Sequence, residues 1–281
     1  MYNKQIEGFT LFKKKPNAIN YGSLYVKKIV IPCSFEKKRT LRVWLPEDYN
    51  GKKTFEVIYM SDGQNMVDKY TTAYGEWNME DHIHNLQKKG LAGYILVGID
   101  CCYDSKRRME EYSPYNIEKE INKEPIKDFH AYGKEFAEYI VNNIKPLIDK
   151  TFKTIPERSG FIGSSMGGLF SFYISTTYPN IFKFALCYSS ALCLYKKRTI
   201  KKWYKQWNPK PDNCPKLFIY SGAKDKFERN FVNCSKYLYK YLKKKGFNDN
   251  QVSLLIDKNA PHNEAAWSTH VEESLLFINK K

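Results

Sequence analysis

The segment of this 281-residue chain with the clearest chemical meaning lies at 163–167 and reads Gly-Ser-Ser-Met-Gly. This is a G-x-S-x-G pattern centred on Ser165, between a short apolar run at 160–162 and a helical pattern at 168–178. In a strand, turn and helix context the pattern raises a serine hydroxyl above a sheet as a nucleophile. Its glycines leave room for strand and helix to pass closely. We therefore predict that Ser165 is a nucleophile.

A serine hydroxyl attacks only when a base takes its proton, and the base needs a partner that holds its ring. In folds with this turn, the acid and then the histidine follow the serine along the chain. Two of the five histidines lie beyond Ser165. His262 sits in a loop after a strand-like run at 251–256, whereas His270 falls in a helical pattern at 264–279. The predicted base is His262, with His270 as the alternative.

The acid is expected where a parallel strand ends, because open α/β sheets place functional groups at that edge. Residues 216–220 read as a buried strand, and Asp225 follows in the turn after it. Asp225 is therefore the first choice. Glu228 and Asp257 are the alternatives, since each lies within a few residues of the same edge. The competing interpretation of Asp225 is the N-cap of a helix expected at 230–245.

The negative oxygen of a tetrahedral intermediate needs preorganised donors. One is expected from the backbone N–H of Met166, directly after the nucleophile. The other is expected from the turn after an apolar strand at 55–60, where Gly63 or Gln64 would supply an N–H. The competing interpretation is an ordinary polar turn with an Asp-Gly signal.

Three further groups of side chains have residue types that could take part in chemistry or in structural pairs. Trp77 and Trp267 are expected in the core or the pocket wall and are the candidates for substrate contact. Arg108 and Glu111, three residues apart, are predicted to form a structural ion pair. Two histidines at 82–84 would point to different sides of a helix, which argues against joint metal binding. Neither a metal nor a cofactor is predicted.

The elements that must hold these residues alternate along the chain. Runs at 24–33 and 40–45 alternate apolar and polar residues, as half-exposed antiparallel strands do. Runs at 55–60 and 94–99 are almost continuously apolar, as strands covered on both faces are. The other expected elements are helices at 76–89 and 132–149 and strands at 184–189, 216–220 and 251–256. The pattern predicts an α/β fold with a mostly parallel, doubly wound sheet and helices on both faces.

Length and composition fit one domain over 1–281, with an N-terminal extension at 1–22 and a candidate lid or insert loop at 100–132. The chain is 42% hydrophobic and has a net charge of +16. Its lysines occur as scattered doublets and triplets and far outnumber its arginines, which favours a solvated surface over nucleic-acid binding. Seven cysteines without C-x-x-C spacing favour free thiols. No signal peptide or 18-residue apolar window is evident, so a cytoplasmic protein without a membrane partner is expected.

Five segments in consistent order resemble the putative esterase family, the esterase D-like group that includes feruloyl, acetylxylan and enterobactin-type siderophore esterases and mycolyltransferases. They are YMSDGQNM, RRMEEYSP, GKEFAEYIVNNIKPLIDKTFKT, GSSMGG and PHNEAAW, and the similarity runs over 24–277. The resemblance implies the α/β-hydrolase fold and carboxylic-ester hydrolysis. It places Ser165, Asp225 and His262 on the family's nucleophile, acid and base positions.

The chain departs from the family in two places. Where the family often has His before Asp-Gly-Gln-Asn, this chain has Ser61, which leaves the backbone donors of that turn unaffected. The charged segment 116–129 looks longer than the family norm and is a candidate lid.

The sequence therefore predicts a serine esterase that acts on a small-molecule ester through an acyl-enzyme. Two alternatives remain: an acyltransferase that uses the same acyl-enzyme, and a non-catalytic basic binding protein with a vestigial triad. The oligomeric state is not indicated.

Overall fold

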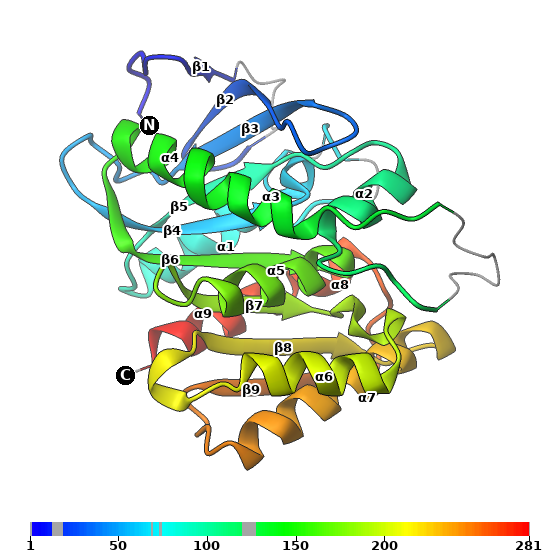
Figure 1. Cartoon of the computed structure of the whole chain (residues 1–281). Helices are drawn as coiled ribbons and strands as arrows, with labels where there is room; N and C mark the ends of the chain where they lie inside the picture. The colour runs from blue at the N-terminus through cyan, green and yellow to red at the C-terminus, as the bar shows by residue number, and fades with distance from the viewer. Residues whose placement is uncertain (1, 13–18, 69, 73–74, 120–127, 281) are drawn as a thin grey trace.

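A computed structural model of the protein describes residues 2–12, 19–68, 70–72, 75–119 and 128–280. Within them, one sheet has the strand order β1-β2-β3-β5-β4-β6-β7-β8-β9 (Figure 1). The strands are β1 Thr10–Leu11, β2 Ser23–Val30, β3 Lys38–Leu45, β4 Phe55–Ser61, β5 Tyr94–Ile99, β6 Thr154–Ser164, β7 Phe182–Tyr188, β8 Lys216–Gly222 and β9 Val252–Asp257. The strands from β5 to β9 in this order run parallel, and β1, β2 and β3 are antiparallel to their neighbours. The predicted fold class, a mostly parallel α/β sheet, is confirmed.

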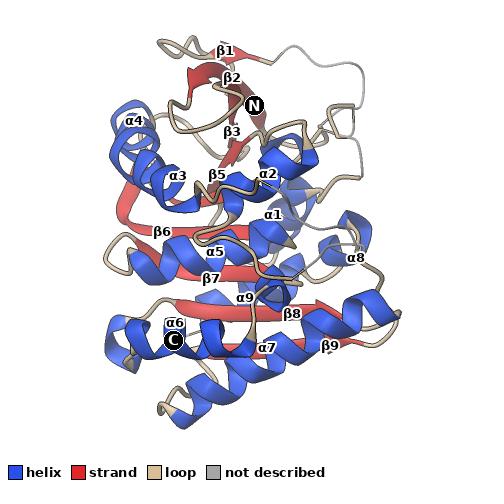
Figure 2. Cartoon of the chain, turned by 45° about the vertical axis from the view of Figure 1, so that its right-hand side comes forward, coloured by secondary structure: helices blue, strands red, loops and turns tan. Residues whose placement is uncertain are grey.

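Helices cover both faces of the sheet (Figures 1 and 2). The α-helices are α1 Met79–Lys88, α2 Ser105–Tyr112, α3 Gly133–Tyr139, α4 Lys145–Thr151, α5 Met166–Thr177, α6 Lys197–Trp207, α7 Lys226–Lys244, α8 Glu264–Ser268 and α9 Val271–Asn279. Short 3-10 helices lie at Gly63–Asn65, Ala191–Leu194 and Pro211–Asn213, and a π-helical turn at Ile140–Ile144 joins α3 to α4. One apolar core lies under α3 to α7, and a second under α1 and α9. Strands buried on both sides, such as β5, explain the continuous apolar runs.

Four helical features differ from the prediction. The helix α2, Ser105–Tyr112, lies within the candidate lid or insert loop at 100–132, and α6 was not predicted. The long helix α7 begins at Lys226, four residues before the expected start. The helix expected at 264–279 is divided into α8 and α9. In the N-terminal extension, Thr10–Leu11 forms β1 and pairs with β2.

Glu80 is a buried carboxyl in the first turn of α1, with 2% of its surface exposed. Its Oε2 has no hydrogen-bond partner among the described residues. Burial raises the pKa of Glu80 to about 8, and the nearby carboxylates of Asp81 and Glu76 add to the rise. The fold therefore favours the protonated form of this side chain.

Glu80→Gln is expected to stabilise the protein at pH 8 and to have little effect at pH 4.5. The folded pKa lies above that of the unfolded chain, so the stability linked to Glu80 is present below the unfolded pKa and is lost as the pH rises toward about 8. Glutamine is neutral throughout and avoids this loss, a gain on the order of 2–4 kcal/mol at pH 8. Urea unfolding at both pH values measures it. The exposed Glu157→Gln is the control, and an equal gain in both variants would contradict the burial argument.

Candidate active site

Ser165 stands on a strained turn between β6 and α5. Its φ and ψ are 56° and −117°, a conformation that residues other than glycine rarely adopt. Its backbone N–H donates to the carbonyl of Tyr188 over 2.8 Å, and its carbonyl accepts from the N–H groups of Leu169 and Ala191. Strain of this kind persists where the surroundings fix the backbone. The predicted strand, turn and helix around Ser165 are thus present.

The glycines on either side of the turn are required by the close approach of β4. A Cβ added to Gly163 or to Gly167 would lie 2.2 Å from the hydroxyl oxygen of Ser61, the last residue of β4. The Ser61 hydroxyl itself donates to the carbonyl of Ile162 over 3.5 Å. The small Ser61 side chain therefore packs directly against the turn that carries Ser165.

His262 is paired with Glu228. Its Nδ1 lies 2.9 Å from Oε1 of Glu228, and the Glu228 side chain is fully buried. The hydroxyl of Ser189 lies 3.1 and 3.2 Å from the two oxygens of the same carboxylate. The rings of Phe231 and Trp267 pack against the imidazole, with centroids 4.7 and 4.9 Å away. The imidazole is therefore held at one nitrogen and by the aromatic rings that surround it.

Asp225, the first choice for the acid, has a different role. It is the N-cap of α7, and its Oδ1 accepts a hydrogen bond from the backbone N–H of Glu228 over 2.9 Å. The early start of α7 explains the correction. It places Glu228 on the first turn of the helix, where its longer side chain reaches inward to His262, while exposed Asp225 satisfies the helix end. The carboxylate beside His262 is thus Glu228, one of the two alternatives.

The remaining alternatives, His270 and Asp257, pair with each other. Nε2 of His270 lies 3.1 Å from Oδ2 of Asp257, and its Nδ1 lies 3.3 Å from Glu273. The backbone N–H of Asn259 and the His270 ring lower the pKa of Asp257. Both side chains therefore belong to a separate ion-pair cluster.

The turn after β4 presents Gly63 and Gln64 as the first residues of the 3-10 helix Gly63–Asn65. Met166 is the first residue of α5. The first N–H groups of a helix have no acceptor within it, so all three positions suit an oxyanion donor. The side chain of Gln64 is already engaged, because its Oε1 accepts from the N–H of Cys101 over 3.2 Å and its Nε2 lies 3.1 Å from the Cys101 sulfur.

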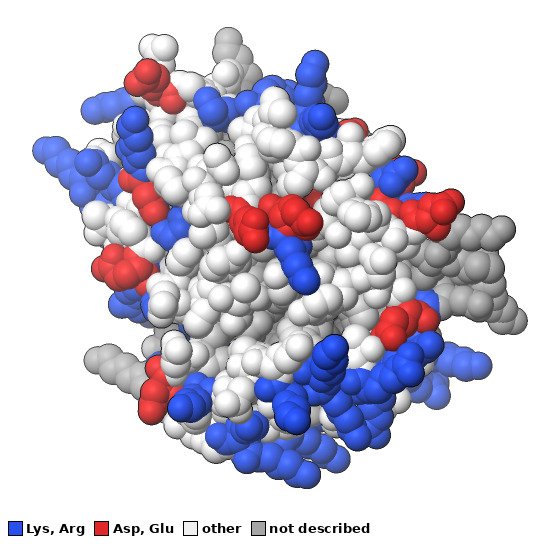
Figure 3. All heavy atoms as spheres, in the orientation of Figure 1, with Lys and Arg blue, Asp and Glu red and all other residues white. Residues whose placement is uncertain are grey.

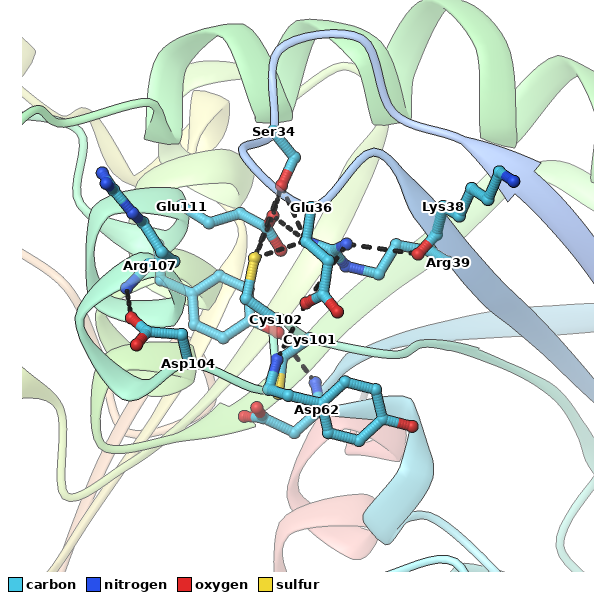
Figure 4. Close-up of polar contacts among 12 residues, drawn as sticks. Ser34, Glu36, Lys38, Arg39, Asp62, Cys101, Cys102, Asp104, Arg107 and Glu111 are labelled. Atoms are coloured by element: carbon cyan, nitrogen blue, oxygen red, sulfur yellow. Dashed lines mark hydrogen bonds and ion pairs between the residues drawn. The ribbon is translucent and has the colours of Figure 1, made fainter.

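The predicted ion pair between Arg108 and Glu111 is wrong. Arg108 instead donates to both carboxylate oxygens of Asp62, over 2.6 and 2.7 Å. Buried Glu111 lies 2.9 Å from Arg39 and accepts from the Ser34 hydroxyl, in the cluster drawn in Figure 4. The two residues lie on α2 but bind different partners. One ties α2 to the turn after β4, and the other ties it to the turn between β2 and β3.

Two cavities share Ser165 in their walls. The His262 cavity has a volume of about 420 Å³, and its lining includes His262, Glu264, Trp267, Asp62 and Gln64. The α7 cavity has a volume of about 510 Å³, and its lining includes Met166, Leu194, Phe227, Asn230, Phe231 and Cys234. Ser165 thus lies where the cavity that contains His262 meets one walled by α7.

The two tryptophans have different positions. Trp267 lines the His262 cavity, and its indole N–H donates to the Ser189 hydroxyl over 3.3 Å. Trp77 is 1% exposed and packs on Trp267 and Tyr188, with ring centroids 5.9 and 4.9 Å away. Trp267 is therefore a cavity wall residue. Trp77 belongs to the core behind it, and its prediction as a substrate contact is corrected.

Sequence reasoning missed Ser189 and Phe231. Ser189 follows β7 directly, so the rule that placed Asp225 after β8 also applies to it. Phe231 lies one turn beyond Glu228 on α7, and both side chains contact His262. A helix that began at residue 230 would not have placed them on one face.

Other predictions concern the whole chain. The seven cysteines are free thiols. Of the candidate lid, residues 120–127 lie outside the described residues, while α2 occupies part of 100–132. None of the helices in the described part of the chain combines the length and apolar character that crossing a membrane requires.

The chain is similar to several known proteins. A family model described as "Putative esterase" matches residues 33–272. The uncharacterized protein YbbA of Bacillus subtilis (strain 168) is 25% identical over 255 residues, which is 86% of this chain and 93% of that protein. The BES protein from Bacillus cereus superposes with a TM-score of 0.72 and 18% identity, over 96% of this chain and 99% of that one. The siderophore hydrolase EstA from Aspergillus nidulans superposes with a TM-score of 0.69 and 18% identity, over 95% of this chain and 97% of that one.

Proposed function

Because the chain belongs to this esterase family and is a carboxylic-ester hydrolase, we propose that it works through Ser165 as nucleophile, His262 as base and Glu228 as the acid that orients the base. One observation carries the proposal. The Nδ1 of His262 lies 2.9 Å from the buried Glu228 carboxylate, and the same cavity contains Ser165 on its strained turn.

The pairing with Glu228 fixes the imidazole tautomer. When Nδ1 donates its proton to the carboxylate, Nε2 is left as an acceptor for the hydroxyl proton of Ser165. Glu228 also stabilises the imidazolium that forms on proton transfer. The Ser189 hydroxyl lies within hydrogen-bond distance of both carboxylate oxygens and helps to hold the acid in position.

The reaction then has two halves. The Ser165 oxygen attacks the ester carbonyl, and the N–H of Met166 with that of Gly63 or Gln64 binds the oxyanion. His262 gives its proton to the leaving alcohol, and the acyl group remains on Ser165. Water, deprotonated by His262, attacks the acyl-enzyme and releases the carboxylic acid. The two cavities give room for the acyl and alcohol parts of a small-molecule ester on either side of the reacting carbon.

A fluorophosphonate probe tests the nucleophile directly. The probe is expected to label the protein once, with the adduct on the peptide that contains Ser165, because only an activated serine reacts quickly with it. Mass spectrometry locates the adduct. His262→Ala should slow labelling strongly while circular dichroism shows an intact fold. Labelling of another residue at the same rate, or none, would rule out the proposed nucleophile.

A further inference from the structure

The positive charge of this protein is concentrated on two segments that are separate in the sequence. Residues 196–214, which contain α6, have seven Lys or Arg and one Asp, and residues 226–245, which contain α7, have seven and one Glu. These segments carry twelve of the sixteen net positive charges, and the rest of the chain is nearly balanced. Figure 3 shows Lys and Arg gathered along the lower part of the molecule, over α6 and α7. The scattered appearance of the lysines in the sequence therefore does not describe the surface.

The two helices pack together through tyrosines and leave a groove above them. The hydroxyl of Tyr241 donates to the carbonyl of Tyr204 over 2.7 Å, and the rings of Tyr204 and Tyr237 stack with centroids 5.8 Å apart. A groove of about 330 Å³ lies over these rings, with exposed Lys201, Lys205 and Lys245 in its walls. No carboxylate of the described residues lines it.

Few of these cations are neutralised within the protein. Among the described residues, Lys243 is the one of the fourteen that forms an ion pair with a carboxylate, that of Asp249 at 2.9 Å. Unpaired like charges on adjacent helices repel each other. A bound polyanion would remove this repulsion.

The groove and the α7 cavity lie along the same face of α7. Asn230 and Cys234 line the α7 cavity, and Tyr237 and Tyr241 line the groove. Residues three or four apart share one side of a helix, so these four form a continuous stripe. A three-residue step is about 5 Å along the axis, so the groove begins about one helical turn from the cavity that contains Ser165.

We propose that this groove is an exosite for a linear acidic polysaccharide. The groove holds the polysaccharide while an ester group on the same polysaccharide molecule enters the α7 cavity. The proposal rests on the proposed ester hydrolysis at Ser165. Twelve of the fourteen cations are lysines, which are point charges on flexible stems, whereas nucleic-acid recognition favours the forked guanidinium of arginine. The tyrosine rings beneath them offer an apolar surface with a polar edge. None of the exposed large apolar side chains of the described residues lines the groove. A helix that enters a bilayer presents such side chains, so this face suits a polymer in water better than a membrane.

The test compares a charged polymer ester with a small one. The triple variant Lys201→Gln, Lys205→Gln and Lys245→Gln is expected to lower kcat/KM for acetylated polygalacturonate roughly tenfold at low salt, because three exposed charge pairs are lost. Its kcat/KM for p-nitrophenyl acetate should match that of the wild type, which also reports an intact fold. The matched control removes the same charge elsewhere, with Lys37→Gln, Lys52→Gln and Lys88→Gln. It should hydrolyse both substrates like the wild type.

Binding is measured separately from activity, with polygalacturonate and proteins that also carry Ser165→Ala. The groove variant should raise Kd roughly tenfold, and the control triple should leave it unchanged. Equal weakening in both triples would overturn the proposal. Tighter binding to single-stranded oligothymidylate or to vesicles of anionic phospholipid than to polygalacturonate would also overturn it. If Ser165→Ala keeps its activity, the proposed mechanism fails while the binding result still decides the exosite.

Discussion

Replacing Ser165 by alanine is expected to lower kcat/KM for p-nitrophenyl acetate by roughly 10³-fold to 10⁶-fold. The substitution removes the oxygen that forms the acyl-enzyme and leaves the oxyanion donors and the cavities in place. Alanine carries the same Cβ into the positive-φ turn, so the backbone strain and the melting temperature should change little. The expected loss is therefore in kcat.

The adjacent serine provides the control for this prediction. Ser164 ends β6 and also lies in the wall of the His262 cavity, so Ser164→Ala changes the same region without touching the proposed nucleophile. Its effect should be less than about tenfold. Steady-state kinetics with both variants measures the difference. Similar activity in the two variants would show that the hydroxyl at 165 does not carry out the reaction.

The parts of the site that were predictable from the sequence depend on short-range patterns. The turn around Ser165 is defined by five consecutive residues and by the strand and helix that flank it. The loop of His262 follows a strand whose apolar run is clear in the sequence. Because parallel strands bring their carboxyl ends to one edge, local patterns were enough to place these residues near one another.

The identity of the acid depends on where α7 begins, and this is the kind of boundary that sequence patterns locate poorly. A shift of four residues in the start of the helix turns Asp225 into a cap and Glu228 into the partner of His262. Both carboxylates fit the chain order, so the order alone could not separate them.

The concentration of positive charge on α6 and α7 was not predictable from the sequence for a related reason. The sequence shows lysines in short groups, and periodicity within one helix does not reveal which other helix lies beside it. The contact between Tyr204 and Tyr241 brings α6 next to α7 and combines two moderate charges into one strongly basic face. The pair of Arg39 with Glu111 could not be predicted for the same reason, because the two residues are 72 positions apart and only the fold brings them together.

Glu228→Gln is expected to lower kcat/KM by roughly 10²-fold to 10⁴-fold. The amide nearly preserves the shape of the side chain, but it removes the negative charge that stabilises the imidazolium. It can also present an N–H to Nδ1 of His262, which would favour the wrong tautomer. The loss should appear mainly in kcat, because Glu228 is fully buried and lies behind the imidazole.

Asp225→Ala decides between the two carboxylates. As the cap of α7, Asp225 should contribute about 0.5–2 kcal/mol to stability, and its removal should lower the melting temperature while leaving kcat/KM within a few-fold of the wild type. Measuring both quantities for both variants gives opposite signatures for a cap and for an acid that orients the base. If Asp225→Ala abolished activity and Glu228→Gln did not, the acid would be Asp225, and α7 would have to begin later in the active protein.

The hydrogen bond from the N–H of Glu228 to Asp225 fixes the first turn of α7, so loss of the cap should also loosen Glu228, the partner of His262. Asp225→Ala is therefore expected to lower kcat slightly. Asparagine can still cap the helix, so recovery of kcat in Asp225→Asn would support the assignment of the acid to Glu228.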